Sequence, residues 1–302
     1  MAQPSSETPQ EVIDGVIDLC SKDRKALITC SLISRAWVNR SRKYLFSSLT
    51  LTSKNLSAWC AVVATQTQQQ PPKSSPLSPS YAPPSPYVTS LQFASEISQV
   101  GSGNFEEALV RASTHFSAFV NLSSLTLFAV SISFIAFMGA PLEACFGSLG
   151  KTVRKLKLDV CALDWMFLAF LKLFTHLEEL ELNENIWVDY KLIPWTSAPG
   201  NHPTLCGSFE ITGFTDASIK ILDSLSPARI KYHTITIGYN RSSTFSQFNT
   251  LFARCKGHLK TLVFTNADSL VPARGQWSFC PQFPSSSRED RANETRNRWS
   301  GP

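Results

Sequence analysis

The sequence has few charged residues, little glycine and no long apolar run. The last two shortages each exclude a class of protein. Glycine accounts for 13 of 302 residues, too few for a collagen-like chain. The most apolar stretches, 132–142 and 160–174, are shorter than the roughly 20 apolar residues of a membrane-spanning helix. No basic and apolar leader opens the sequence, so we expect neither a secretory signal nor a membrane partner. The expected location is the cytoplasm, the nucleus or both.

Motifs for catalysis, metal binding and nucleic-acid binding are also missing. The eight cysteines form no C-x-x-C pair and the five histidines no H-x-x-x-H pair, so we expect free thiols, no metal and no cofactor. The sequence has no nucleophile elbow, phosphate loop or dinucleotide fingerprint, which argues against an enzyme and leaves no candidate catalytic residue. The net charge of +5 includes no run of four basic residues, so nucleic acid is not an expected partner.

Hydrophobic residues make up 43% of the chain, enough for a large buried core, but one segment cannot contribute to it. Residues 66–87 are rich in proline, serine and glutamine, and seven of the 18 prolines lie between Pro71 and Pro86. Proline lacks the amide donor that helices and inner strands need. We therefore expect 66–87 to be a disordered linker.

Before this linker, residues 8–51 have the periodicity of three short helices, with the second over 24–33 and the third over 35–46. The first helix has two apolar faces. Val12, Val16 and Leu19 share one face, and Pro9, Ile13 and Ile17 share the other. A unit of this size buries too little to cover both faces, so we expect a partner or the rest of the chain to complete it.

After the linker, one apolar pattern recurs at intervals of 24 to 34 residues and predicts a repeat architecture. The pattern is apolar-x-x-apolar-x-apolar, found at Val88/Leu91/Phe93, Leu122/Leu125/Leu127, Val153/Leu156/Leu158, Leu177/Leu180/Leu182, Cys206/Phe209/Ile211, Tyr232/Ile235/Ile237 and Leu259/Leu262/Phe264. An eighth match, Phe46/Leu49/Leu51, precedes the linker. Helical periodicity follows several of these triplets, at 105–119, 164–176, 215–225 and 244–255. We expect an α/β fold in which 88–267 form a solenoid with one parallel sheet.

Two parts of the sequence resemble known families. The segment TPQEVIDGVI (8–17) matches the F-box opening L-P-x-E-I-L-x-x-I-L, and LISRAW (32–37) matches its ending L-V-C-K/R-x-W. Residues 23–51 are similar to the divergent F-box of mushroom-type fungi. The triplets resemble the leucine-rich repeat L-x-x-L-x-L-x-x-N/C, whose last position is Cys161, Asn185 and Asn240 in three units.

This resemblance implies an adaptor of an SCF-type cullin–RING ubiquitin ligase. The F-box would dock onto a Skp-type adaptor subunit and the repeats would bind an unknown protein substrate. By the family match, the adaptor-binding residues would be Pro9, Ile13, Ile17, Leu27, Leu32, Ile33 and Trp37. Some of them could instead form the core of the three helices. The alternative function is a leucine-rich-repeat interaction module that acts outside ubiquitin ligation.

Charged side chains flank the apolar positions of the central repeats. Side chains alternate along a strand, so these residues are expected on the outer face of the sheet. They are Lys155, Lys157, Glu179, Glu181 and Glu210. They would either bind substrate or pair with one another across neighbouring strands, and we favour the pairing.

The last segment, 268–302, is polar and lacks the repeat, so we expect a disordered tail. The final predicted strand, near 259–264, would then have an open edge.

Overall fold

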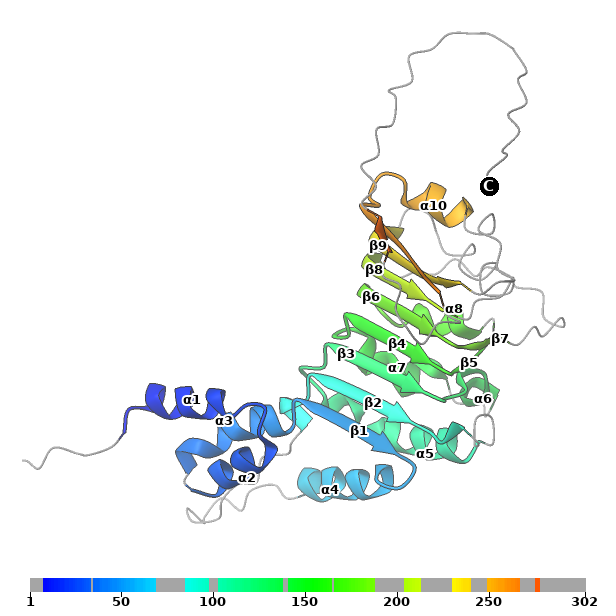
Figure 1. Cartoon of the computed structure of the whole chain (residues 1–302). Helices are drawn as coiled ribbons and strands as arrows, with labels where there is room; N and C mark the ends of the chain where they lie inside the picture. Colours follow the sequence, from blue (N-terminus) through cyan, green and yellow to red (C-terminus); the bar gives the residue numbers. More distant parts are fainter. Residues whose placement is uncertain are drawn as a thin grey trace, which may run out of the picture.

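The computed structural model describes residues 8–33, 35–68, 85–97, 103–137, 141–164, 166–187, 204–212, 230–239, 249–266 and 275–277. Within these ranges the chain is a mixture of helices and strands built around one sheet of nine strands (Figure 1). A unit of three helices lies beside the first strand of the sheet (Figure 1). The expectation of an α/β fold with a parallel sheet is confirmed at this level.

The three expected N-terminal helices are present. They are α1 (Gln10–Leu19), α2 (Arg24–Ile33) and α3 (Arg35–Leu45). Pro9 precedes α1, and its carbonyl oxygen accepts hydrogen bonds from the amides of Val12 and Ile13. Asp23 caps α2, because its carboxylate accepts the backbone amides of Lys25 and Ala26. Both helices therefore begin at residues that suit a helix start.

The main sheet contains the predicted triplets in sequential order. Its strands, in spatial order, are β1 (Ser48–Thr52), β2 (Ser90–Ala94), β3 (Ser124–Phe128), β4 (Lys155–Asp159), β6 (His176–Asn183), β8 (Thr204–Ile211), β9 (Ile230–Tyr239), β10 (Thr261–Asn266) and β11 (Gly275–Trp277). The first eight strands are parallel, and β11 is antiparallel to β10. A second, two-stranded sheet pairs β5 (Ala162–Leu163) with β7 (Ile186–Trp187).

The register of the sheet confirms the predicted repeat. One column joins Leu49, Leu91, Leu125, Leu156, Leu180, Phe209, Ile235 and Leu262 across the eight parallel strands, and a second joins Leu51, Phe93, Leu127, Leu158, Leu182, Ile211, Ile237 and Phe264. The register shifts at Gly207, whose φ is +76°. A Cβ atom there would lie 2.2 Å from the carbonyl oxygen of Glu178, so the bulge requires glycine.

Helices lie on one face of the main sheet, and α5, α7 and α8 are seen behind it in Figure 1. The helical segments after α3 are α4 (Leu56–Gln68), η1 (Ser85–Tyr87), α5 (Asn104–Ala112), η3 (Ser113–Ala118), α6 (Ile132–Phe137), α7 (Leu142–Gly150), α8 (Met166–Leu171) and α10 (Asn249–Cys255). The expected helices at 105–119, 164–176 and 244–255 have counterparts in α5 with η3, α8 and α10. Helix α8 ends at Leu171, before the expected end, and residues 244–248 lie outside the described residues. The one expected at 215–225 lies outside the described residues. A chain of aromatic contacts through Phe93, Phe116, Phe146, Phe170 and Phe174 joins the sheet to these helices.

The turns after β3, β4 and β6 share one conformation. Ala129, Val160 and Glu184 occupy equivalent places and all have positive φ, between 47° and 54°. The next repeat position contains Cys161 or Asn185, and the Asn185 side chain accepts the Cys161 amide and donates to the Leu158 carbonyl. These turns therefore tie neighbouring units together at their C-terminal ends.

The boundaries differ from those expected at two places. Strand β1 belongs to the sheet, as the eighth triplet Phe46/Leu49/Leu51 indicated, although we also placed 48–51 in the helical domain. Residues Gln66–Gln68 continue α4 and 85–87 form η1, so these ends of the expected linker are ordered. The remainder, 69–84, lies outside the described residues. The proline-rich segment thus interrupts the first repeat and does not separate the three helices from the sheet.

The end of the sheet is also different from the expectation. Three residues of the expected tail, Gly275–Trp277, form β11 and pair with Leu262–Phe264. The edge of β10 is therefore covered along part of its length. The rest of 268–302 lies outside the described residues.

Candidate protein-binding surfaces

The structure divides the seven predicted adaptor-binding residues into two groups. Ile13, Ile17 and Leu27 are buried, and with Cys30 they form the core of the three helices. Trp37 packs half-buried against the same core. We therefore reassign the three buried residues from partner contact to core, because they hold the helices together and have almost no surface to offer. Pro9, Leu32 and Ile33 are exposed.

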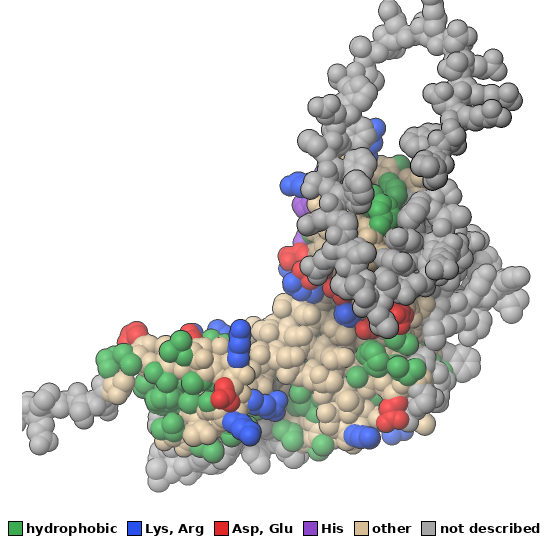
Figure 2. All heavy atoms as spheres, in the orientation of Figure 1, with side chains coloured by type: hydrophobic (Ala, Val, Ile, Leu, Met, Phe, Trp, Pro, Cys, Tyr) green, Lys and Arg blue, Asp and Glu red, His purple; other side chains and the backbone are tan. Residues whose placement is uncertain are grey.

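An apolar face that no described residue covers lies on α1 and α2. Val12, Val16 and Leu19 line one side of α1, and Ile28, Leu32 and Ile33 extend from α2. Leu19 and Leu32 are 89% and 80% exposed. Figure 2 shows hydrophobic side chains gathering over this unit. We call these six residues the apolar face. Only two of them were among the predicted contact residues, although the sequence had indicated the Val12/Val16/Leu19 face of α1.

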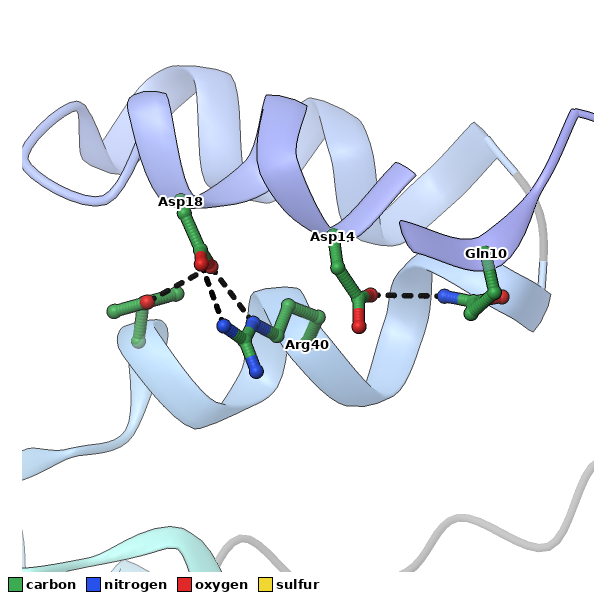
Figure 3. A network of polar contacts seen from close by, with 5 residues as sticks. Gln10, Asp14, Asp18 and Arg40 are labelled. Carbon is green, nitrogen blue, oxygen red and sulfur yellow. Dashed lines mark hydrogen bonds and ion pairs between the residues drawn. The ribbon is translucent and has the colours of Figure 1, made fainter. Parts of the chain in front are cut away.

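Polar contacts hold one side of α1 against α3. Arg40 on α3 donates from Nε and Nη2 to the two carboxylate oxygens of Asp18, at 2.7 and 2.5 Å (Figure 3). The Tyr44 hydroxyl donates to the same carboxylate at 2.8 Å. These hydrogen bonds, first of all the one from Arg40, lower the pKa of Asp18 to about 2. At the other end of α1, Gln10 donates to Asp14 and to the Ala36 carbonyl of α3.

Helix α1 therefore has three distinct sides. One is buried on Ile13 and Ile17, one is held to α3 by the Asp18–Arg40 pair, and the third is the apolar face. The Asp18–Arg40 pair lies where α1 meets α3, while Val12 and Val16 are exposed away from the core. What remains exposed is suited to an apolar protein partner.

The predicted charged residues of the sheet lie together on its outer face. Lys155 pairs with Glu179 at 2.6 Å, and Lys157 pairs with Glu181 at 3.2 Å, each across β4 and β6. The hydrogen bond that Lys155 donates to the Glu179 carboxylate raises the pKa of Lys155. The favoured interpretation, a ladder of ion pairs, is thus confirmed for these four residues. Such exposed pairs contribute little to stability.

Glu210 differs from the other four. It lies on β8 beside Glu181, and Thr236 occupies the facing position on β9, so no cation stands opposite it. Burial raises the pKa of Glu210, and the negative charge of Glu181 adds to this. The rest of the outer face is rich in hydroxyl groups, with Ser90, Ser124, Thr126, Thr234 and Thr261 at outward positions of the strands. The face can therefore form hydrogen bonds with a polypeptide.

A thiol and an imidazole meet near the start of β6 and β8. The Cys206 sulfur lies 3.2 Å from Nε2 of His176, and the Glu178 carboxylate lies 3.9 Å from the same nitrogen. A catalytic triad needs the acid on the opposite ring nitrogen. Burial raises the pKa of the Cys206 thiol, the reverse of what an activated nucleophile requires. Glu178 is therefore not placed as the acid of a triad.

Within the described ranges, no three His, Cys, Asp or Glu side chains come together to hold a metal ion. None of the helices in the described part of the chain has the length and apolarity that crossing a membrane would need.

Comparison with known proteins adds no assignment. The chain matches no model of a known protein family, and a search of curated proteins also finds no match.

Proposed function

We propose that the chain is the substrate-recognition adaptor of an SCF-type cullin–RING ubiquitin ligase. In this proposal α1–α3 act as an F-box that docks onto a Skp-type adaptor subunit. The sheet and its helices act as a leucine-rich-repeat-like solenoid that holds a protein substrate. The chain itself performs no chemistry, which belongs to other subunits of the ligase.

The observation that carries the proposal is the apolar face of α1 and α2. Single exposed aliphatic residues are ordinary, but Val12, Val16 and Leu19 follow one another at helical spacing on α1, and the same small unit also exposes Leu32 and Ile33 on α2. They coincide with the segments that match the F-box opening and the F-box ending. A partner that covers this face would remove its apolar side chains from water, and this burial favours association.

The repeat geometry supports the second half of the proposal. Equivalent apolar residues stack in register from β1 to β10, and the turns after β3, β4 and β6 each contain one residue with positive φ. Asn185 occupies the asparagine position of the leucine-rich-repeat signature and bridges two units through its side chain. An outer face rich in hydroxyl groups and charges is suited to bind a polypeptide.

The junction between the two parts supports a positioning role. Only Phe46 and Ser47 separate α3 from β1, and the Ser47 carbonyl accepts the amides of Thr89 and Ser90, each at 2.9 Å. The Tyr87 hydroxyl also donates to Asn39 of α3. These contacts couple the helices directly to the sheet. A substrate on the sheet would then be held at a fixed distance from the docked adaptor, which raises the effective concentration of its lysines at the ligase.

Co-purification with a Skp-type adaptor tests the proposal. The variant Val16→Asp/Leu32→Asp places two charges on the apolar face, and we expect it to lose binding by at least about tenfold, or roughly 1.4 kcal/mol. The matched control is Ile97→Asp/Val120→Asp, which changes two exposed aliphatic residues elsewhere, 60% and 58% exposed. The control should bind as the unchanged chain does. Wild-type binding by the first variant, or no binding by the unchanged chain, would contradict the proposal. The second result would favour the interaction module outside ubiquitin ligation.

A further inference from the structure

Charge is distributed unevenly along the solenoid. Between Ala228 and Ala267 the sequence contains no aspartate or glutamate, whereas it contains six lysines and arginines and two histidines. The central strands are different, because Lys155 and Lys157 are each matched by a glutamate on the next strand. The last units therefore have a positive charge that their own sequence does not balance.

The structure brings four of these residues together at one end of two neighbouring strands. Lys231 and His233 lie on β9, while His258 and Lys260 lead into β10. The amide of Lys260 donates to the His233 carbonyl at 2.8 Å, just before the pairing of Thr234 with Thr261. Neighbouring strands are about 4.8 Å apart, so the four side chains share a small area. We call them the basic patch.

The basic patch is open to solvent. All four side chains are exposed, and Figure 2 shows histidine and basic side chains along this edge of the upper sheet. On β8, the residue that faces Lys231 of β9 is Cys206, so the pairing of these two strands places no carboxylate opposite Lys231. Among the ion pairs of the described residues, none includes Lys231 or Lys260. The amides of His258 and Leu259 both donate to the Cys255 carbonyl, which fixes the turn that carries His258.

Hydroxyl groups adjoin the patch on the outer face of the same strands. Thr234 and Thr261 follow directly after His233 and Lys260, and Thr236 comes two residues later on β9. A partner polypeptide that binds across this region would contact the basic side chains at the strand ends and the hydroxyl groups further along the strands. The arrangement suits carboxylates joined by a peptide backbone, since each exposed ion pair is weak and several must act together.

We propose that the basic patch binds an acidic segment of a partner protein. Under the proposed function, on which this role depends, the partner is the substrate of the ligase. The patch is confined to the ends of two strands, and the Tyr232 ring between Lys231 and His233 is buried and cannot stack on a base. A short acidic peptide therefore fits it better than a nucleic acid, which needs stacking or a longer basic track.

The test uses the full chain and a fluorescent 12-residue peptide of alternating glutamate and serine, followed by anisotropy at low salt. The variant Lys231→Glu/Lys260→Glu reverses two charges in the patch. Lys256 is left unchanged because it follows the C-terminal end of α10, where a cation favours the helix. The control, Lys22→Glu/Lys25→Glu, makes the same change in net charge on exposed residues beside or within α2. A peptide with glutamine in place of glutamate reports binding that does not need charge.

We expect the patch variant to lose at least about tenfold in affinity for the acidic peptide, while the control stays within about twofold. Equal losses in both variants would show a net-charge effect and overturn the proposal, and so would an unchanged patch variant. Tighter binding of single-stranded DNA than of the peptide, lost in the same variant, would overturn the choice of a protein partner. Adaptor co-purification by the patch variant should be unchanged. If the unchanged chain does not bind the Skp-type adaptor but still binds the acidic peptide, the proposed role in ubiquitin ligation is contradicted and the basic patch remains as a peptide-binding site.

Discussion

The register of the sheet can be tested with two neighbouring substitutions, Leu180→Ala and Glu179→Ala. Leu180 has 0% exposure and stands in a column between Leu156 and Phe209. Truncation removes three carbons, worth about 0.8 kcal/mol each, or about 2.4 kcal/mol in transfer free energy. The cavity left behind adds to this, so the expected loss in unfolding free energy is about 2–5 kcal/mol.

Glu179 is one residue away but on the opposite side of the strand. Its side chain is 37% exposed and forms an ion pair with Lys155, whose side chain is 50% exposed. An exposed pair of this kind contributes about 0–1 kcal/mol, so Glu179→Ala should cost much less than Leu180→Ala. The contrast arises because side chains alternate along a strand.

Urea denaturation of the two variants measures both losses. The midpoint of Leu180→Ala should fall clearly below that of Glu179→Ala, with similar slopes for both. Equal destabilisation, or a larger loss for Glu179→Ala, would show that the two side chains do not lie on opposite faces. The columns of the parallel sheet would then be incorrect.

Three further predictions concern the junction, a buried acid and α1. Cleavage at a protease site inserted within 69–84 should leave both fragments together on size exclusion, because β1 pairs with β2 across the cut; separation under native conditions would contradict the shared first repeat. Burial raises the pKa of Glu106, because the neutral form is favoured in the folded chain. Glu106→Gln should therefore be more stable than the unchanged protein at pH 7, and this gain should disappear near pH 4. A gain in stability that persists in acid would argue against this. The pKa of the Asp18 carboxylate is lowered from 3.8 to about 2, so this group should stabilise the fold above pH 3.8 and lose this effect as the pH falls toward 2. The melting temperatures of Asp18→Asn and of the unchanged chain should therefore converge in acid. A difference in melting temperature that does not change with pH would count against the Arg40 contact.

The columns of the sheet were predictable because strand alternation and a repeated spacing leave one consistent register. Leu156, Leu180 and Ile235 each sit at the same place in their unit, and equivalent places superpose when units stack. The short strand at 48–52 was harder to assign, because five alternating residues directly after a helix resemble its last turn. Pairing with β2, 42 residues later, decided it.

The division of the helical unit into core and partner surface could not be read from periodicity. Both apolar faces of α1 have the same spacing, so the pattern does not say which one packs inward. The structure shows that Ile13 and Ile17 pack inward, and that Asp18 pairs with Arg40, a residue 22 positions away. The left-handed turns were also hidden, since Ala129 and Val160 are not residues that favour positive φ. The basic patch, in contrast, had a signal in the sequence: the stretch without acids between 228 and 267.

Calorimetric titration of the full chain with a purified Skp-type adaptor tests the central claim most directly. We predict saturable one-to-one binding with a negative change in heat capacity, because the apolar face on α1 and α2 would be removed from water. The heat should disappear for Val16→Asp/Leu32→Asp and remain for Ile97→Asp/Val120→Asp. A folded, unchanged chain that gives no binding, or binding that both variants retain, would contradict the assignment of α1–α3 as the adaptor-docking unit.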